Sequence, residues 1–136
     1  MARIFTYHVS SLVSVHDGDT CLVVVDLGFD LSRRVDIRVN GIDTPEMMGI
    51  SKAAATVARD VAAAWIKNRI DRLVLISKEL DKYGRVLGDL QDTADSSRLS
   101  DYMINQKLAH AYDGGTKLAW SRAEYLAICA STALKK

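Results

Sequence analysis

The segment 35–46 constrains the fold most, because a strand pattern runs directly into the one proline of the chain. Its first six residues, V-D-I-R-V-N, alternate between apolar and polar side chains, which is typical of a half-buried strand. Pro45 fixes its own φ and disfavours the helical region for Thr44. A stiff turn therefore follows the strand, and it carries two carboxylates, Asp43 and Glu46. Such positioning favours a functional site over a generic loop.

Three strand patterns separated by tight turns open the chain, at residues 4–15, 21–27 and 33–42. The first pattern is interrupted near Ser10 and ends at Asp17-Gly18, a hairpin signal in which glycine accepts positive φ and Asp17 serves as a turn former. These runs predict an antiparallel meander.

The hydrophobic period changes after residue 50. Residues 51–69 are rich in alanine and predict a helix with Ser51 as its N-cap. Strand patterns follow at 72–78 and 85–90, and Ser100 is placed to cap a short helix that ends at Lys107. A last helix is predicted over 118–134, with Trp120 on its apolar face.

This order of elements predicts one α+β domain, residues 1–136, built as an OB-fold-type five-stranded β-barrel with three packed α-helices. Hydrophobic residues make up 49% of the chain, which is enough for a core. No apolar run is long enough to cross a membrane. No basic-then-apolar leader follows Met1, so we expect a cytoplasmic protein, although a secreted form whose leader had been removed would look the same. The net charge of +1, taken alone, gives no sign of the basic surface that nucleic-acid-binding proteins often have.

Three short segments carry the chemistry: D-G-D-T at 17–20, R-V-N-G-I-D-T-P-E at 38–46 and D-K-Y-G-R at 81–85. Carboxylate and carbonyl oxygens are what Ca²⁺ or Mg²⁺ prefers, and guanidinium groups match the charge of phosphoryl oxygens. A further carboxylate can orient or deprotonate a water molecule. This set of groups fits metal-assisted phosphodiester hydrolysis, although Asp-Gly turns and Arg–carboxylate pairs are common in other proteins. The side chains concerned are Asp19, Asp43, Glu46, Arg38 and Arg85.

In their order and spacing these segments resemble the thermonuclease family, the staphylococcal-nuclease-like domains. The similarity continues through L-S-D-Y-M-I-N-Q-K-L-A-H-A-Y and spans nearly the whole chain. The resemblance implies a Ca²⁺-dependent, endonuclease-type hydrolase of low sequence specificity that breaks the P–O5′ bond of DNA or RNA and leaves 3′-phosphate ends. In that family pattern, one Ca²⁺ is held by Asp19, Asp43 and the backbone carbonyl of Thr44.

The resemblance also implies roles for the remaining groups. Glu46 acts on the attacking water, either as the general base or as the group that positions it. Arg38 and Arg85 hold the phosphate and stabilise the five-coordinate transition state. Lys82 and Tyr83 flank the phosphates. Tyr112 offers a stacking surface for bases, which favours single strands, and we expect the enzyme to act as a monomer without a membrane partner.

The chain departs from the family pattern in two places. Only four residues, 47–50, separate Glu46 from the helix, where the type enzyme has a long lysine-rich loop; we therefore expect weaker electrostatic attraction to nucleic acid. Lys107 stands where the family often has glycine, and a left-handed conformation there would cost about 1 kcal/mol. The alternative function is a non-catalytic binding or scaffold domain of the same fold. Such a domain would tolerate loss of site residues, whereas all five catalytic and carboxylate positions match the active pattern.

Overall fold

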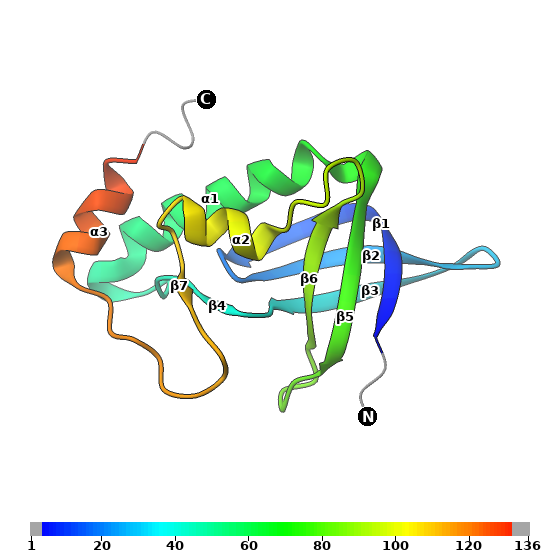
Figure 1. Ribbon diagram of the computed structural model, residues 1–136, viewed down its shortest axis with the longest axis horizontal. Helices are drawn as coiled ribbons and strands as arrows, with labels where there is room; N and C mark the ends of the chain where they lie inside the picture. The colour runs from blue at the N-terminus through cyan, green and yellow to red at the C-terminus, as the bar shows by residue number, and fades with distance from the viewer. Residues whose placement is uncertain (1–3, 132–136) are drawn as a thin grey trace.

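Five strands close a barrel in the order β1-β2-β3-β6-β5 in the computed structural model, which describes residues 4–131 (Figure 1). The barrel strands are β1 (Phe5–Asp17), β2 (Thr20–Gly28), β3 (Leu31–Val39), β5 (Leu73–Leu80) and β6 (Val86–Asp92). Two short strands, β4 (Ile42–Asp43) and β7 (His110–Ala111), form a separate two-stranded sheet. The helices are α1 (Lys52–Lys67), α2 (Leu99–Asn105) and α3 (Arg122–Cys129), with single 3-10 turns at η1 (Gly49–Ser51) and η2 (Ile70–Arg72).

The strand pairing confirms the predicted OB-fold-type barrel. β1, β2 and β3 form the expected antiparallel meander, and β1 closes the barrel against β5. β3 pairs with β6 in parallel, a connection that needs a crossover, and α1 lies within it. The interruption predicted near Ser10 is a register shift between Val9 and Ser11, inside a continuous strand.

Helix α1 covers the barrel with its small side chains. Ala54, Ala58 and Ala62 are buried, so the helix axis can approach β1 closely, and Val61 and Trp65 extend the same face. α2 and α3 pack against α1 in turn (Figure 1). Within residues 4–131, no helix has the length and apolar character needed to cross a membrane.

Ser51 occupies the predicted N-cap position of α1, whereas the predicted cap at Ser100 is wrong; neither serine caps a helix through its hydroxyl. Ser51 precedes α1, but its hydroxyl donates to the carbonyls of Glu46 and Met48 instead of accepting from the helix. Ser100 lies inside α2, and its hydroxyl donates to the carboxylate of Asp89. In both cases a nearby carbonyl or carboxylate oxygen competes with the helix end for the hydroxyl.

The last helix is shorter than predicted. It begins after Ser121, which forms a capping box with Glu124, and ends at Cys129. Trp120 therefore precedes the helix, and residues 132–134 of the predicted range lie outside the described residues. Lys107, which follows α2, has a φ of 60°, so the costly left-handed case considered from the sequence does occur in the fold.

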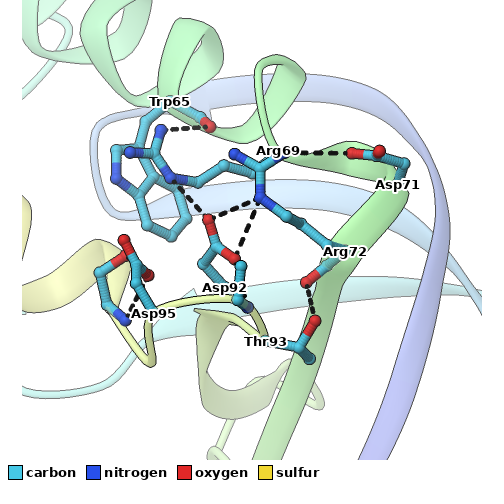
Figure 2. Close-up of polar contacts among 9 residues, drawn as sticks. Trp65, Arg69, Asp71, Arg72, Asp92, Thr93 and Asp95 are labelled. Carbon is cyan, nitrogen blue, oxygen red and sulfur yellow. Dashed lines mark hydrogen bonds and ion pairs between the residues drawn. The ribbon is translucent and has the colours of Figure 1, made fainter.

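A buried carboxylate links the end of α1 to the barrel. Asp92 on β6 is 1% exposed and accepts a hydrogen bond from Arg72 Nε at 2.9 Å, while Arg69 Nε lies 3.3 Å away (Figure 2). The Arg69 guanidinium also covers the ring of Trp65 on α1, 4.5 Å from its centroid. One carboxylate thus holds the end of α1, η2 and β6 together.

We predict that Asp92→Asn lowers the free energy of unfolding by about 2–4 kcal/mol, because it leaves two arginines without their shared counter-ion. This loss is smaller than the largest losses known for broken buried ion pairs, because both guanidinium groups remain partly exposed to solvent. Urea unfolding followed by circular dichroism measures the change.

Asp71→Asn is the matched control. Asp71 also pairs with Arg72, but its side chain is 81% exposed, so we expect a change within about 0.5 kcal/mol. Equal losses in the two variants would contradict a special role for the buried carboxylate.

Candidate functional site

A small cleft gathers side chains from four separate parts of the chain. Its walls come from the β1–β2 turn, the segment from the end of β3 through β4, the β5–β6 hairpin and the loop before α3. We call it the acidic cleft, and it is lined by Asp17, Asp19, Thr20, Arg38, Asp43, Thr44, Glu46, Arg85 and Lys117. The structure therefore brings together all six residues for which the sequence predicts a metal-binding or catalytic role.

Asp19 is the most constrained carboxylate in this cleft. It is 6% exposed, and its Oδ2 accepts a hydrogen bond from the Thr44 amide at 3.0 Å and lies 3.4 Å from Arg38. Its Oδ1 accepts from the Thr20 hydroxyl at 3.0 Å. Burial acts to raise the pKa of Asp19, but the hydrogen bond from Asp17, the Arg38 charge and the Thr44 amide outweigh it and lower that pKa.

Asp17 shapes the turn in front of Asp19. Its Oδ1 accepts from the Asp19 amide at 3.3 Å, as expected for a turn former. Burial, followed by the hydrogen bond to Asp19 and the negative charge of that residue, raises the pKa of Asp17 to about 7. At neutral pH the Asp17 side chain is therefore protonated in about half of the molecules, while Asp19 is ionised.

Gly18 fits under the cleft because it has no side chain. A Cβ at this position would lie 2.8 Å from Cγ2 of Thr44, 3.1 Å from Cβ of Ala58 and 3.1 Å from Cε of Met103. The sequence predicts a glycine here for positive φ, but Gly18 does not adopt positive φ. The close approach of the turn to Thr44, α1 and α2 is the actual requirement.

Asp43 is a buried residue of the same cleft, and a loop that is distant in the sequence contacts both of its carboxylate oxygens. Lys117 Nζ lies 3.3 Å from Oδ1, and Trp120 Nε1 donates to Oδ2 at 3.3 Å. The sequence does not identify these two partners: Lys117 belongs to no motif, and Trp120 is predicted to be a packing residue. Trp120 also stacks on His110, the residue of β7 that pairs with Asp43.

The two arginines are held by neighbours rather than free in solvent. Arg38 donates to the Val39 carbonyl at 2.8 Å and has a side chain only 12% exposed. Arg85 Nε donates to Asp81 Oδ2 at 2.8 Å. Burial acts to raise the pKa of Asp81. Hydrogen bonds from the Arg85 and Tyr83 amides and from the Arg85 side chain outweigh burial and lower that pKa, so Asp81 is ionised. Both guanidiniums are fixed before any substrate arrives, which favours charge stabilisation.

Glu46 is exposed at the rim of the acidic cleft, and its backbone is fixed. The Glu46 carbonyl accepts from the Ser51 hydroxyl at 2.6 Å and from the Met48 amide at 2.8 Å. Met47 contacts Thr56 on α1, whereas Met48 is 64% exposed. The short segment after Glu46 thus forms a compact turn against α1 and leaves the carboxylate facing solvent.

A larger groove of about 480 Å³ adjoins the acidic cleft and shares Arg38, Arg85 and Lys117 with it. We call it the tyrosine groove, since Tyr83 and Tyr112 line it together with Lys82. The three residues predicted to bind substrate therefore lie beside the acidic cleft. Tyr83 is 71% exposed, and its ring lies 5.1 Å from Lys82 Nζ and 5.4 Å from the Arg85 guanidinium carbon.

The donor set suits a hard divalent cation. Two buried carboxylates, Asp19 and Asp43, line one cleft, and the Thr44 hydroxyl there is buried and has no hydrogen-bond partner among the described residues. Within residues 4–131, no three His, Cys, Asp or Glu side chains are grouped as a metal centre. An ion held here would therefore need backbone and water oxygens as further ligands, as Ca²⁺ accepts.

Comparison with known proteins identifies one matching family. The model of the family described as "Staphylococcal nuclease homologue" matches residues 36–133, which is most of the chain. A search of curated proteins finds no match. The matched range includes Arg38, Asp43, Glu46 and Arg85, whereas Asp19 precedes it and is connected to the site by the fold.

We predict that Gly18→Ala destabilises the fold by about 1–3 kcal/mol, because the added methyl overpacks the contact with Thr44, Ala58 and Met103. Thermal and urea unfolding measure the loss. Gly115→Ala is the control: its Cβ would meet only the exposed side chain of Asp113, at 3.1 Å, and we expect a change below about 0.5 kcal/mol. A Gly18→Ala variant as stable as the control would contradict the close packing of this turn.

Proposed function

The chain belongs to the family of staphylococcal nuclease homologues, and from that membership we propose that it is a Ca²⁺-dependent nuclease that hydrolyses the phosphodiester bonds of DNA or RNA. One observation carries the proposal. Two buried carboxylates, two fixed arginines and one exposed glutamate line a single cleft, although they come from three separate segments of the sequence. A domain that only binds would have no need to keep this combination.

In this proposal, Asp19, Asp43 and the Thr44 carbonyl would hold Ca²⁺, which would supply Lewis-acid chemistry at the scissile phosphate. The exposed carboxylate of Glu46 orients a water molecule for in-line attack on phosphorus and accepts its proton. The P–O5′ bond breaks, the 5′-oxygen leaves with a proton from solvent, and the new P–O bond gives a 3′-phosphate.

Arg38 and Arg85 stabilise the negative charge that develops on the phosphoryl oxygens. Because Asp19 and Asp81 already hold the two guanidiniums beside the cleft, little reorganisation is needed during the reaction. Lysine could replace the charge, but it lacks the two-point geometry of the guanidinium group.

The tyrosine groove supports binding of a single strand with low sequence specificity. Exposed Tyr83 and half-buried Tyr112 offer ring faces on which any base can stack, and in this proposal Lys82, which lines the same groove, flanks the phosphates. A net charge of +1 provides little long-range attraction, so affinity depends on contacts inside the groove.

The first test is cleavage of a labelled single-stranded DNA by the purified protein. We predict cleavage with millimolar Ca²⁺, none with EDTA, and 3′-phosphate ends on the products. Glu46→Gln should lower kcat about 10²-fold or more, because the amide cannot accept the proton of the attacking water.

Two outcomes would refute this. A wild-type protein that binds Ca²⁺ but cuts neither DNA nor RNA would point to the scaffold function. Equal cleavage in EDTA, or an undiminished Glu46→Gln variant, would show that the assigned site is not the source of the activity.

The second prediction concerns the arginines. Arg85→Lys and Arg38→Lys should each lower kcat about 10²-fold with a smaller change in KM, since the fork geometry acts mainly in the transition state. Arg59→Lys is the control, because Arg59 lies on α1 away from both clefts and pairs with Asp60. A pure KM effect in the site variants would assign the arginines to ground-state binding only.

A further inference from the structure

The loop 112–121 covers Asp43 with a positive charge. Lys117 Nζ lies 3.3 Å from Asp43 Oδ1, and Trp120 Nε1 binds the other oxygen of the same carboxylate. Asp43 is 5% exposed, whereas the Lys117 side chain is 49% exposed. The contact therefore joins a buried charge, which needs a partner, to a lysine that retains access to solvent.

Lys117 also lines a second space. It forms part of the tyrosine groove together with Lys82, Arg85 and Tyr112, and its ammonium group lies 5.7 Å from the centre of the Tyr112 ring. The same side chain is thus in reach of the acidic cleft and of the groove where a nucleic-acid phosphate would lie. Its four-carbon stem can change rotamer without movement of the backbone.

We propose that Lys117 has two binding positions: it neutralises Asp43 while no divalent cation is bound, and it binds a phosphate of the nucleic acid once a cation takes Asp43. The inference rests on the proposed function for the cation and the substrate. It adds a phosphate-binding residue to the site and states when that residue is available.

Electrostatics requires the exchange. A buried carboxylate without a partner is strongly unfavourable, so Asp43 needs Lys117 in the absence of a metal ion. A divalent cation ligated by Asp43 would lie only a few ångströms from the ammonium group, and like charges at that distance repel. Trp120 can stay in place, since its N–H carries no net charge, so the exchange involves one side chain.

Two binding properties follow from the exchange. The cation must displace Lys117, so its apparent affinity for the free protein is lower than the intrinsic affinity of the site. Once displaced, Lys117 adds a charge-assisted hydrogen bond to a phosphate. By linkage, the cation and the nucleic acid each raise the affinity for the other.

Ca²⁺ titration by calorimetry, without nucleic acid, tests the first property. We expect Lys117→Met to bind Ca²⁺ about 3–10-fold more tightly than the wild type, because no tethered cation competes. Lys82→Met removes an equal charge from the same groove without touching Asp43, and its Ca²⁺ affinity should equal that of the wild type. Equal or weaker Ca²⁺ binding by Lys117→Met would overturn the proposal.

Fluorescence anisotropy with a labelled single-stranded oligonucleotide tests the second property, in a Glu46→Gln background that slows cleavage about 10²-fold. With Ca²⁺ present, Lys117→Met should weaken binding about 3–10-fold; in EDTA it should have no effect, since Asp43 holds the lysine. Lys82→Met should weaken binding in both conditions. An equal loss for Lys117→Met with and without Ca²⁺ would overturn the exchange.

These readouts separate the inference from the proposed function. If the wild type and both lysine variants fail to bind Ca²⁺, the metal site itself is refuted, and the exchange with it. If Ca²⁺ and the oligonucleotide bind but Lys117→Met behaves as the wild type in both assays, the exchange alone is refuted and the nuclease proposal stands.

Discussion

The architecture of the site depends on one buried negative charge, the carboxylate of Asp19. A charge at this depth is tolerated only when its oxygens are paired. The Thr44 amide, the Thr20 hydroxyl and the Arg38 guanidinium satisfy this requirement, and they belong to the β1–β2 turn, the end of β3 and the corner that follows. The pairing therefore fixes where these segments meet, and Gly18 allows the turn to come close enough for the contacts to form.

The second buried carboxylate, Asp43, is positioned by strand pairing. Asp43 lies on β4, whose partner β7 comes after α2, so the small β4–β7 sheet joins the barrel corner to the C-terminal part of the chain. The Tyr112 amide donates to the Gly41 carbonyl at 2.9 Å and continues this attachment. The loop 112–121 starts from that anchor, and the capping box at Ser121 fixes its other end. Lys117 and Trp120 therefore reach Asp43 from a loop that is fixed on both sides.

Periodicity and turn chemistry predict the barrel because each strand there satisfies a local rule, and the motif residues predict the acidic cleft because each stands at a strand end. No local sequence pattern predicts that Lys117 and Trp120 contact Asp43. These contacts span more than seventy residues and depend on the pairing of β4 with β7. The hydroxyls of Ser51 and Ser100 make no cap hydrogen bond for a related reason: each donates to another oxygen, and only the folded chain shows that oxygen to be the Glu46 carbonyl or the Asp89 carboxylate. Sequence thus predicts the residues of the site but not the loop that neutralises it.

The loop 112–121 matters because the chain as a whole carries little net positive charge. With a net charge of +1 and no lysine-rich segment after Glu46, the protein lacks a broad positive field to draw in a polyanion. Positive charge is instead concentrated at the border between the acidic cleft and the tyrosine groove, where Arg38, Arg85 and Lys117 line both spaces. Each of the three pairs with a carboxylate in the absence of ligands, namely Asp19, Asp81 and Asp43. If the proposed cation binds, it offsets the charges of Asp19 and Asp43 and makes this border more positive, so in that proposal the ion strengthens substrate binding as well as serving the chemistry.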